Sequence, residues 1–401
     1  MKSPSLLIAL THLALSQARA LPPRVGLNTT TTLIATEYGS VFDAPVTIGG
    51  QTFHLLVDTG SSDTYVMRSD YTCINQTSGQ TLPRAECNYS NRTYTPSPRY
   101  QEVKDTMFGI EYGAGIASGV MAYEDVALNS VTARNQQIAV ANTSTPMGDG
   151  ISSGLLGLAY PSLSSAHPAN HTDNATYWFD RRVYTPLVQT LAAQSQINPF
   201  FSLALAHTPQ NASVSFGGYL SLGDLPPVPH AEFTTVPVEV TKALPLNFTS
   251  NQHTLSYWTT TIKSAVWGKH NHTLTHSKQP FQAFIDSGNP ASILPSAIVD
   301  PINALFDPPA TYIPDKKVFV VDCAAKAPSF GLEIGTQVFF HQGRDLIYQT
   351  AEGACVTAFF RAEEVGVQGV SVNILGAAFL KNVVSVFDFG RNEMRFAGRL
   401  D

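Results

Sequence analysis

The feature that most constrains this chain is a nine-residue pattern that occurs twice, more than half the chain apart. The first copy is Phe53–Ser61 (FHLLVDTGS) and the second is Phe281–Asn289 (FQAFIDSGN). Each reads as a phenylalanine, three variable residues, a β-branched residue, an aspartate, a small hydroxyl residue and a glycine. A shorter echo follows each copy, at Leu155–Gly157 (LLG) and Ile374–Gly376 (ILG). Two echoes in the same order indicate a duplicated domain that forms two similar lobes.

The remaining sequence favours β-structure. Many segments are rich in Val, Ile, Thr and Phe and are bounded by Gly, Pro or Asn, which is typical of strands. Only Pro186–Gln196 and Ser296–Leu305 favour helices, and 247–253 is expected to be an exposed loop. The pattern predicts an all-β fold of packed sheets or barrels. The expected strands are Thr31–Val46, Gly109–Val126, Phe200–Leu205, Ala212–Phe216, Val318–Val321 and Val383–Phe389.

The N-terminus has the features of a secretory signal peptide. It begins with Met1 and Lys2, continues through an apolar stretch at 6–15 and ends at Ala18-Arg19-Ala20, an A-x-A exit. The apolar stretch is too short to span the ~30 Å of membrane hydrocarbon, and His12 interrupts it. We therefore expect residues 1–20 to be a signal peptide, and the protein to be secreted and extracellular, without a membrane anchor. The lobe junction is placed near residue 207, which gives a short N-terminal segment at 21–30 and lobes at 31–207 and 208–401.

Sequons and charge agree with an extracellular protein. Lys and Arg total 24 against 30 Asp and Glu, a net charge of −6, which argues against a nucleic-acid binder, since such a protein would show a basic face. Ten Asn-x-Ser/Thr sequons, all before residue 272, predict a heavily glycosylated surface. Their asparagines are Asn28, Asn75, Asn88, Asn91, Asn142, Asn170, Asn174, Asn211, Asn247 and Asn271.

The four cysteines are Cys73, Cys87, Cys323 and Cys355. An even number in an oxidising compartment implies two disulfides, and four cysteines allow three pairings. The local pairing, Cys73–Cys87 and Cys323–Cys355, keeps each loop within one lobe and is the one we expect. The spacing matches no zinc-binding pattern, so no metal is expected.

The two repeated aspartates carry the predicted chemistry. Asp58 and Asp286 each follow an apolar strand and precede a turn of small residues. If the lobes are related by a pseudo-twofold axis, both turns meet at the cleft between them. Two carboxyl groups in contact do not both ionise easily and share a proton over an acidic range. The ionised group can then take a proton from water while the neutral group donates to a substrate carbonyl.

These motifs resemble those of the pepsin-like aspartic proteases, and of the fungal members in particular. Residues 57–62 (VDTGSS) match the first catalytic motif of that family, and residues 285–288 (IDSG) match the second. Residues 112–115 (YGAG) resemble the flap, whose tyrosine closes over the substrate. Further matches at 154–161, 216–218, 374–376 and 386–388 extend the resemblance over residues 34–400.

The resemblance implies a bilobal fold, with the active site in the cleft between two β-rich lobes. It implies a monomeric endopeptidase that hydrolyses polypeptides at acidic pH with an activated water and no cofactor. Asp58 and Asp286 would be catalytic. The substrate-binding residues would be Tyr112, Gly113, Thr59, Gly60, Ser61, Ser287 and Gly288.

Several positions depart from the family pattern. Asn289 stands where the family usually has Thr or Ser beside the second aspartate, and Tyr65 stands where a Trp is common. Ala114, Ser153 and Ala377 replace polar or acidic residues. Asn289 is the best argument for an alternative function, a binding or inhibitor protein on the same fold that has lost catalysis. The intact aspartates and Tyr112 favour the protease.

Three further observations have smaller weight. Residues 21–30 contain one basic residue, Arg24, so we expect no conventional inhibitory pro-segment there. Residues 150–154 fit the G-x-S-x-G pattern of hydrolases, but the strand-turn-helix context that this motif requires is not evident. His270, His272 and His276 share a polar stretch with a sequon, which favours a solvated loop over a metal site.

Overall fold

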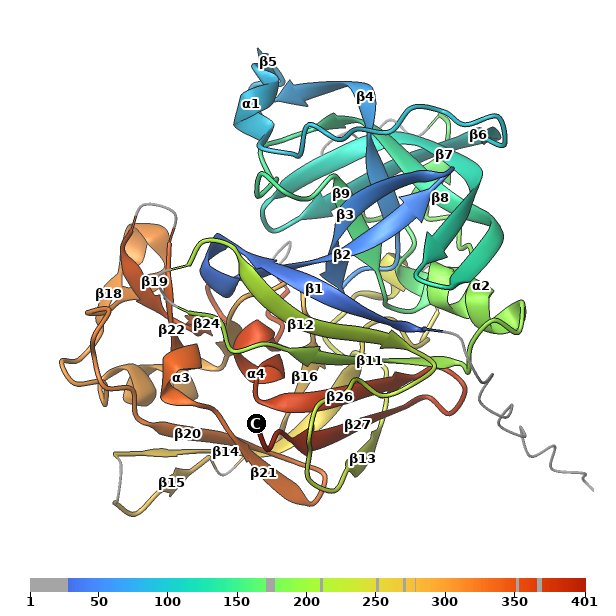
Figure 1. Cartoon of the computed structure of the whole chain (residues 1–401). Helices are drawn as coiled ribbons and strands as arrows, with labels where there is room; N and C mark the ends of the chain where they lie inside the picture. Colours follow the sequence, from blue (N-terminus) through green and yellow to red (C-terminus); the bar gives the residue numbers. More distant parts are fainter. Residues whose placement is uncertain are drawn as a thin grey trace, which may run out of the picture.

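The computed structural model describes residues 28–170, 177–209, 212–249, 252–269, 272–277, 279–350, 353–365 and 370–401 (Figure 1). The expected signal peptide and most of the segment at 21–30 lie outside these residues. So do His270 and the sequon asparagines Asn174, Asn211 and Asn271.

The strands of the described chain form three sheets and far outnumber the helices, which confirms the all-β prediction. The largest contains β1 (Thr30–Thr36), β2 (Val41–Ile48), β3 (Gln51–Asp58), β4 (Thr64–Ile74), β5 (Thr81–Leu82), β6 (Gln101–Tyr112), β7 (Gly115–Leu128), β8 (Val131–Ser144), β9 (Gly154–Gly157), β10 (Ala166–Pro168), β11 (Phe200–Leu205), β12 (Ser215–Leu222), β13 (Thr234–Pro237), β26 (Val383–Asp388) and β27 (Glu393–Gly398). The second contains β14 (Thr259–Gly268), β15 (Thr275–His276), β16 (Phe281–Ile285), β17 (Ser292–Leu294), β20 (Ser329–Ile334), β21 (Gln337–Phe340), β24 (Phe359–Arg361) and β25 (Ile374–Leu375). The third contains β18 (Thr311–Ile313), β19 (Val318–Val320), β22 (Ile347–Gln349) and β23 (Cys355–Thr357).

Helices are few and short. The two helices expected from the sequence are present as α2 (Leu187–Ala193) and α3 (Ser296–Asn303). The others are α1 (Arg84–Cys87) and α4 (Ala377–Leu380), with 3-10 turns η1 (Glu37–Gly39), η2 (Pro161–Leu163), η3 (Leu246–Thr249), η4 (Pro314–Lys316) and η5 (Gly343–Leu346). None of the helices in the described ranges is long and apolar enough to cross a membrane.

The architecture is bilobal, and Figure 1 shows the arrangement. Strands β3, β4 and β6 to β9 form the lobe at the upper right, and the two smaller sheets lie in the lobe at the lower left. A layer of β1, β12, β11, β26 and β27 runs between them and carries the large sheet from one lobe to the other. The proposed lobe boundary near residue 207 falls between β11 and β12 of this layer and stays a prediction.

The two repeats pair in the same way, as a duplicated domain requires. β3 runs parallel to β9, with Leu56 opposite Leu155, and β16 runs parallel to β25, with Ile285 opposite Leu375. In each repeat a third strand pairs antiparallel with the second, β4 with β9 and β17 with β25. Each Asp-hydroxyl-Gly motif thus lies at the end of a strand, β3 or β16, that pairs with the strand containing its echo, β9 or β25.

Two predicted strands are wrong in their extent, because each contains a turn. Residues 31–46 divide into β1 and β2 at η1, where Tyr38 and Gly39 have φ of 57° and 82°. Residues 109–126 form a hairpin of β6 and β7 that turns at Gly113 and Ala114. The expected strand at 212–216 is also misplaced, since β12 begins at Ser215. Because the sequence on both sides of each turn is rich in Val, Ile and Thr, it favours strand throughout and gives no sign of the turn.

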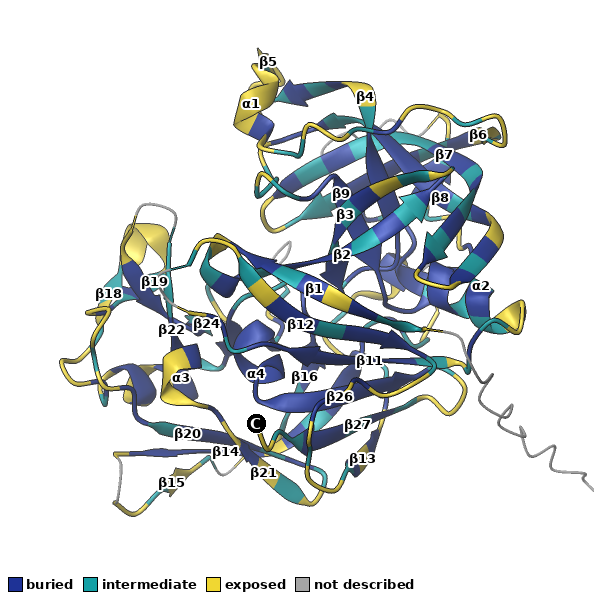
Figure 2. Ribbon diagram, viewed as in Figure 1, coloured by how far each residue is buried: buried dark blue, intermediate teal, exposed yellow. Residues whose placement is uncertain are grey.

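The core is continuous across both halves, as the buried strands in Figure 2 illustrate. Trp258 is fully buried at its centre, with its ring 4.7 Å from that of Tyr160 and 5.2 Å from that of Phe387. Its indole N–H donates to the carbonyl of Leu158 at 2.9 Å. Because Leu158 follows the first echo and Trp258 precedes β14, this contact fixes one lobe against the other.

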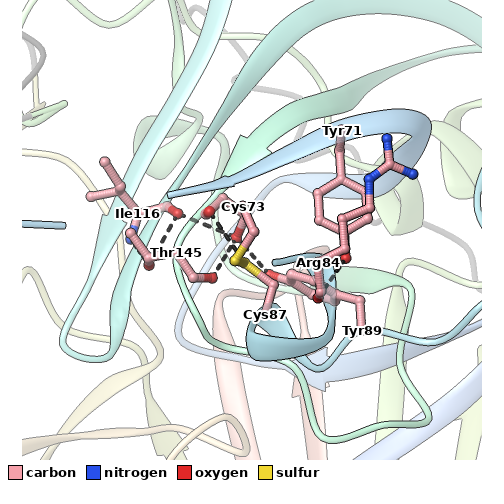
Figure 3. The surroundings of a disulfide bond; sticks show 8 residues. Tyr71, Cys73, Arg84, Cys87, Tyr89, Ile116 and Thr145 are labelled. Carbon is pink, nitrogen blue, oxygen red and sulfur yellow. Dashed lines mark hydrogen bonds between the residues drawn. A yellow bond between two sulfur atoms is a disulfide. The ribbon is translucent and has the colours of Figure 1, made fainter. Parts of the chain in front are cut away.

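Both disulfides have the expected pairing. Cys73–Cys87 joins β4 to α1 (Figure 3), and Cys323–Cys355 joins the segment after β19 to β23. Tyr71 packs edge-on against Tyr89 beside the first bridge, and the guanidinium of Arg84 lies 5.0 Å from the Tyr71 ring. Among the described sequon asparagines, Asn142 is half-buried; those that are exposed are Asn28, Asn75, Asn88, Asn91, Asn170 and Asn247. Glycosylation of these positions stays a prediction.

Candidate active site

The two Asp-hydroxyl-Gly turns meet at the boundary between the lobes. Asp58 ends β3, and Asp286 directly follows β16. A Cβ added to Gly60 would lie 2.6 Å from Oδ1 of Asp286, and one added to Gly288 would lie 2.6 Å from Oδ1 of Asp58. Each glycine therefore lies against the carboxyl group of the opposite turn, where no side chain fits. The close approach explains why both copies of the motif need glycine.

Reciprocal hydrogen bonds join the two turns. The hydroxyl of Thr59 donates to the carbonyl of Ile285 at 2.8 Å and accepts from the amide of Ser287 at 2.9 Å. In the mirrored arrangement, the hydroxyl of Ser287 donates to the carbonyl of Val57 at 2.6 Å and accepts from the amide of Thr59 at 3.1 Å. All of these groups are buried, so the network holds both aspartates in fixed positions.

The donors to the two carboxyl groups are not symmetric. Asp58 accepts from the amide of Gly60 at 2.7 Å and from the hydroxyl of Ser61 at 2.5 Å. Asp286 accepts from the amide of Gly288 at 2.9 Å. Asn289 occupies the position equivalent to Ser61, and its Oδ1 accepts from the amide of Ala291 at 3.0 Å. The side chain of Asn289, the residue that departs from the family pattern, is therefore hydrogen-bonded within its own turn.

The unequal hydrogen bonding of the two carboxyl groups indicates which of them is the more easily protonated. Burial raises the pKa of both carboxyl groups, and the charge of Asp58 raises the pKa of Asp286 further. The hydrogen bonds from Ser61 and Gly60 counteract the rise at Asp58. The pKa of Asp286 is therefore raised further than that of Asp58, so the shared proton is favoured on Asp286.

The tyrosine of the expected flap lies near this pair. β6 ends at Tyr112, which pairs with Gly115 at the start of β7, and Gly113 is exposed in the turn between them. The pKa of Tyr112 is raised by burial and by the charge of Asp58, which places its hydroxyl near the dyad. Tyr65 is buried behind it, 5.5 Å from the ring of Phe108, and its hydroxyl donates to Tyr89.

Sequence reasoning missed several residues around the dyad. Asp63 is fully buried and accepts from the amide of Ser165 at 3.0 Å and from the hydroxyl of Tyr184 at 2.7 Å. Burial raises the pKa of Asp63, and the charge of the half-buried Arg181 opposes that rise. An aspartate five positions after Asp58 was a visible signal, whereas nothing in the sequence near Arg181 or Tyr184 matched a motif.

The other sequence candidates have structural roles or lie apart. The amide of Ser152, in the G-x-S-x-G segment, donates to Asp149 at 2.7 Å, so the segment forms a hydrogen-bonded turn. His276 is exposed on β15. Within the described ranges, no three His, Cys, Asp or Glu side chains gather so that they could hold a metal ion.

Comparisons with known proteins agree with this geometry. The family model of the eukaryotic aspartyl proteases matches residues 42–399. A probable aspartic-type endopeptidase of Aspergillus fumigatus is 35% identical over 374 residues, which cover 91% of this chain and 80% of that protein. Penicillopepsin-1 of Penicillium janthinellum is 25% identical over 88% of this chain and 93% of its own length.

A solved structure shares the fold. The crystal structure of an aspartic proteinase from Irpex lacteus matches with a TM-score of 0.66 at 18% sequence identity, over 92% of this chain and 97% of that one. The chain has the pepsin-like bilobal fold, and its family-model match includes both Asp-hydroxyl-Gly turns and the flap. It therefore belongs to the eukaryotic aspartyl protease family, whose members are aspartic-type endopeptidases.

Proposed function

We propose that the protein is a secreted endopeptidase that hydrolyses polypeptides at acidic pH, with Asp58 and Asp286 as its catalytic dyad. The observation that carries the proposal is the contact between the buried carboxyl group of Asp58 and the partly buried one of Asp286, whose turns are held by the reciprocal Thr59 and Ser287 hydrogen bonds. Such a pair supplies a general base and a general acid at one place. Both disulfides and the fungal relatives support an extracellular location.

The mechanism follows from the asymmetry of the pair. A water between the carboxyl groups loses a proton to Asp58 while its oxygen attacks the carbonyl carbon of the scissile bond. Asp286 gives its proton to the carbonyl oxygen, which produces a neutral tetrahedral diol. As the diol collapses, the proton on Asp58 passes to the leaving nitrogen and a diol proton returns to Asp286. The dyad is thereby restored without a covalent intermediate.

The acidic pH range expected for activity follows from Asp286, the carboxyl group of the pair that holds the proton. Activity requires one proton on the pair, and it ends when Asp286 loses that proton as the pH rises. Asp43 and Asp63 are buried and Asp286 is partly buried, and desolvation raises the pKa of all three carboxyl groups. Their neutral forms are favoured in the folded protein, so both catalysis and stability are best served by acid.

Asn289 gives a direct test of this pH dependence. Asn289→Thr places a hydroxyl where Ser61 stands in the other turn, so that it can donate to ionised Asp286. A hydrogen bond to the charged form lowers the pKa of the carboxyl group. We expect the upper limb of the kcat/KM profile to move down by about one pH unit, since one unit corresponds to about 1.4 kcal/mol. Asn289→Val, which lacks the hydroxyl, is the matched control and should leave that limb unshifted.

A binding or inhibitor protein on the same fold is the second candidate, and it is favoured by Asn289 alone. The proposal is tested by following cleavage of an unfolded protein from pH 2 to pH 8. A maximum at acidic pH supports the protease. Absence of cleavage across the range by folded protein would favour the second candidate, and a maximum above neutrality would contradict the mechanism.

A further inference from the structure

A short strand binds the outer edge of the strand that carries the flap tyrosine. β10 is an edge strand of the large sheet and pairs antiparallel with β6, with Ala166 opposite Phe108. Directly before β10, the carbonyl of Ser165 accepts from the amide of Gly109 at 3.1 Å. Gly109 lies three residues before Tyr112. Contacts that fix β10 therefore also fix the base of the flap.

His167, the central residue of β10, joins this strand pair to a third segment of the chain. The residue is fully buried. Its Nδ1 lies 3.0 Å from the carbonyl oxygen of Phe179, and its Nε2 lies 3.0 Å from the carbonyl oxygen of Gly109. A carbonyl oxygen only accepts hydrogen bonds, and a neutral imidazole has a single N–H. Only the protonated ring, which has a hydrogen on each nitrogen, can donate to both oxygens.

The protonation state of His167 therefore decides whether one or both of these hydrogen bonds exist. A neutral ring turns the lone pair of one nitrogen towards a carbonyl oxygen and loses that bond. Burial opposes the charged ring, whereas two charge-assisted hydrogen bonds favour it. Histidine side chains ordinarily change charge between about pH 5 and 8. We expect both bonds under the acidic conditions proposed for the enzyme, and the loss of one as the pH approaches neutrality.

The segment that His167 reaches also contacts β6 directly, at 177–179. The ring of Tyr177 lies against Gly109, where an added Cβ would be 2.2 Å from its Cδ1. The indole N–H of Trp178 donates to the carboxylate of Glu111, the last residue before the flap tyrosine. The segment thus supports the flap strand over its last residues, and the two bonds of His167 fix the segment to that strand.

Charged and titratable side chains occur on each of the elements around the ring. Arg182 donates to the carbonyl of Asp105 on β6 at 2.7 Å. This contact joins the same two segments, and an arginine does not lose its proton in this pH range. Loss of one His167 bond therefore loosens the flap strand without releasing it. The groups concerned are Lys104, Asp105 and Glu111 on β6, Tyr177, Asp180, Arg181, Arg182 and Tyr184 after it, and Asp63 before β4.

We propose that His167 is a positioning residue for the flap, and that its protonated ring fixes the base of the flap by donating to the carbonyl oxygens of Gly109 and Phe179. The inference rests on the proposed endopeptidase function and adds to it a second group, outside the dyad, whose protonation favours activity. A flap held in one place keeps its tyrosine near the reacting groups and lowers the entropic cost of each turnover.

The first test compares kcat/KM of the full-length secreted protein and of His167→Gln from pH 3.5 to pH 6.5. Glutamine can donate to one carbonyl and does not titrate. Both proteins have the same dyad, so its titration cancels in the ratio of their kcat/KM values. At pH 4 the variant should be about 10-fold less active, which is the effect of one lost hydrogen bond from a charged donor. The ratio should fall towards one as the pH rises.

His276→Gln is the matched control, because His276 is exposed on β15. It makes the same chemical change away from the flap, and its ratio to wild type should stay at one throughout. A ratio for His167→Gln that is the same at every pH would show a structural role that does not depend on charge, and would overturn the inference. Wild type would still cleave at acidic pH in that case, so the proposed function would stand.

The second test needs neither a variant that folds nor a measurable activity. Amide hydrogen exchange of wild type is followed by mass spectrometry at pH 4 and pH 7, with correction for the intrinsic effect of pH on exchange. Residues 105–112 should lose protection by about 10-fold at pH 7 relative to β8 of the same sheet, since one bond of the bridge is lost. An equal change in β6 and β8 would contradict the inference.

The two tests separate failure of this inference from failure of the proposed function. Wild type that cleaves no peptide at acidic pH, yet shows the exchange difference between β6 and β8, would overturn the proposed function and leave the His167 bridge standing. Wild type that cleaves at acidic pH, with a constant ratio to His167→Gln and no exchange difference, would overturn the role of His167 alone.

Discussion

Replacement of either Asp58 or Asp286 by asparagine is expected to reduce kcat/KM for polypeptide substrates by at least about 10³-fold. Each change removes one half of the proton-sharing pair, either the group that takes the proton of water or the group that protonates the carbonyl oxygen. A positioned general acid or base alone contributes about 10²–10⁴-fold, and here the two act together. The measurement is kcat/KM at the acidic optimum, with thermal unfolding to verify that each variant is folded.

The matched control for both variants is Asp315→Asn, at an exposed carboxylate in η4. It makes the same chemical change away from the cleft, so its kcat/KM should stay near that of wild type. Substantial activity in a folded variant of either dyad residue would rule out the two-carboxyl mechanism.

Asp43→Asn is expected to stabilise the protein at neutral pH by up to about 4 kcal/mol relative to its effect at pH 4. Asp43 lies on β2, is fully buried and faces Asp149, which accepts from the hydroxyl of Thr36 and from the amides of Ile151 and Ser152. Burial and the charge of Asp149 raise the pKa of Asp43 to about 9. Folded wild type therefore keeps this carboxyl group protonated where the unfolded chain would ionise it.

The sign of the pH dependence follows from that difference. Since the folded pKa lies above the unfolded value of 3.8, the stability contributed by Asp43 is complete below about pH 4. It is lost towards pH 9, by up to about 1.4 kcal/mol per pH unit. Asp149 acts in the opposite sense, because its pKa is lowered, but its contribution is lost only as the pH falls below its unfolded value. It does not cancel the effect of Asp43 between pH 4 and 7.

The check is the free energy of unfolding of wild type and Asp43→Asn from pH 4 to pH 8. The two curves should lie close together at pH 4 and diverge as the pH rises, with the variant more stable. Asp315→Asn should follow wild type throughout. Parallel curves for Asp43→Asn and wild type would show that Asp43 ionises in the folded protein as it does in the unfolded chain.

The sequence predicted best where a local motif has only one structural solution. The repeated Phe-x₃-β-branched-Asp-hydroxyl-Gly pattern located both turns, because close approach of the turns requires Gly60 and Gly288 and the reciprocal bonds require Thr59 and Ser287. The disulfide pairing was also predictable, since each bridge closes a short loop within one half of the chain.

The sequence predicted least where distant segments meet. Phe248 was expected in an exposed loop, because its neighbours are polar, yet its side chain is buried against Trp178 and Arg181. Asp43 looked like an ordinary polar residue of a strand, and only its position opposite Asp149 makes it a buried acid. The burial of Phe248 and of Asp43 depends on contacts between segments that are distant in the sequence and carry no recognisable motif. A local sequence pattern therefore cannot predict it.

The most direct test of the account is the cleavage of an unfolded protein by purified secreted material at pH 3.5 and at pH 7, with and without pepstatin. The account predicts rapid cleavage at pH 3.5, complete inhibition by one equivalent of pepstatin per folded molecule, and little cleavage at pH 7. Folded protein that binds pepstatin but cleaves nothing at pH 3.5 would contradict it, and so would cleavage that is faster at pH 7 or insensitive to pepstatin.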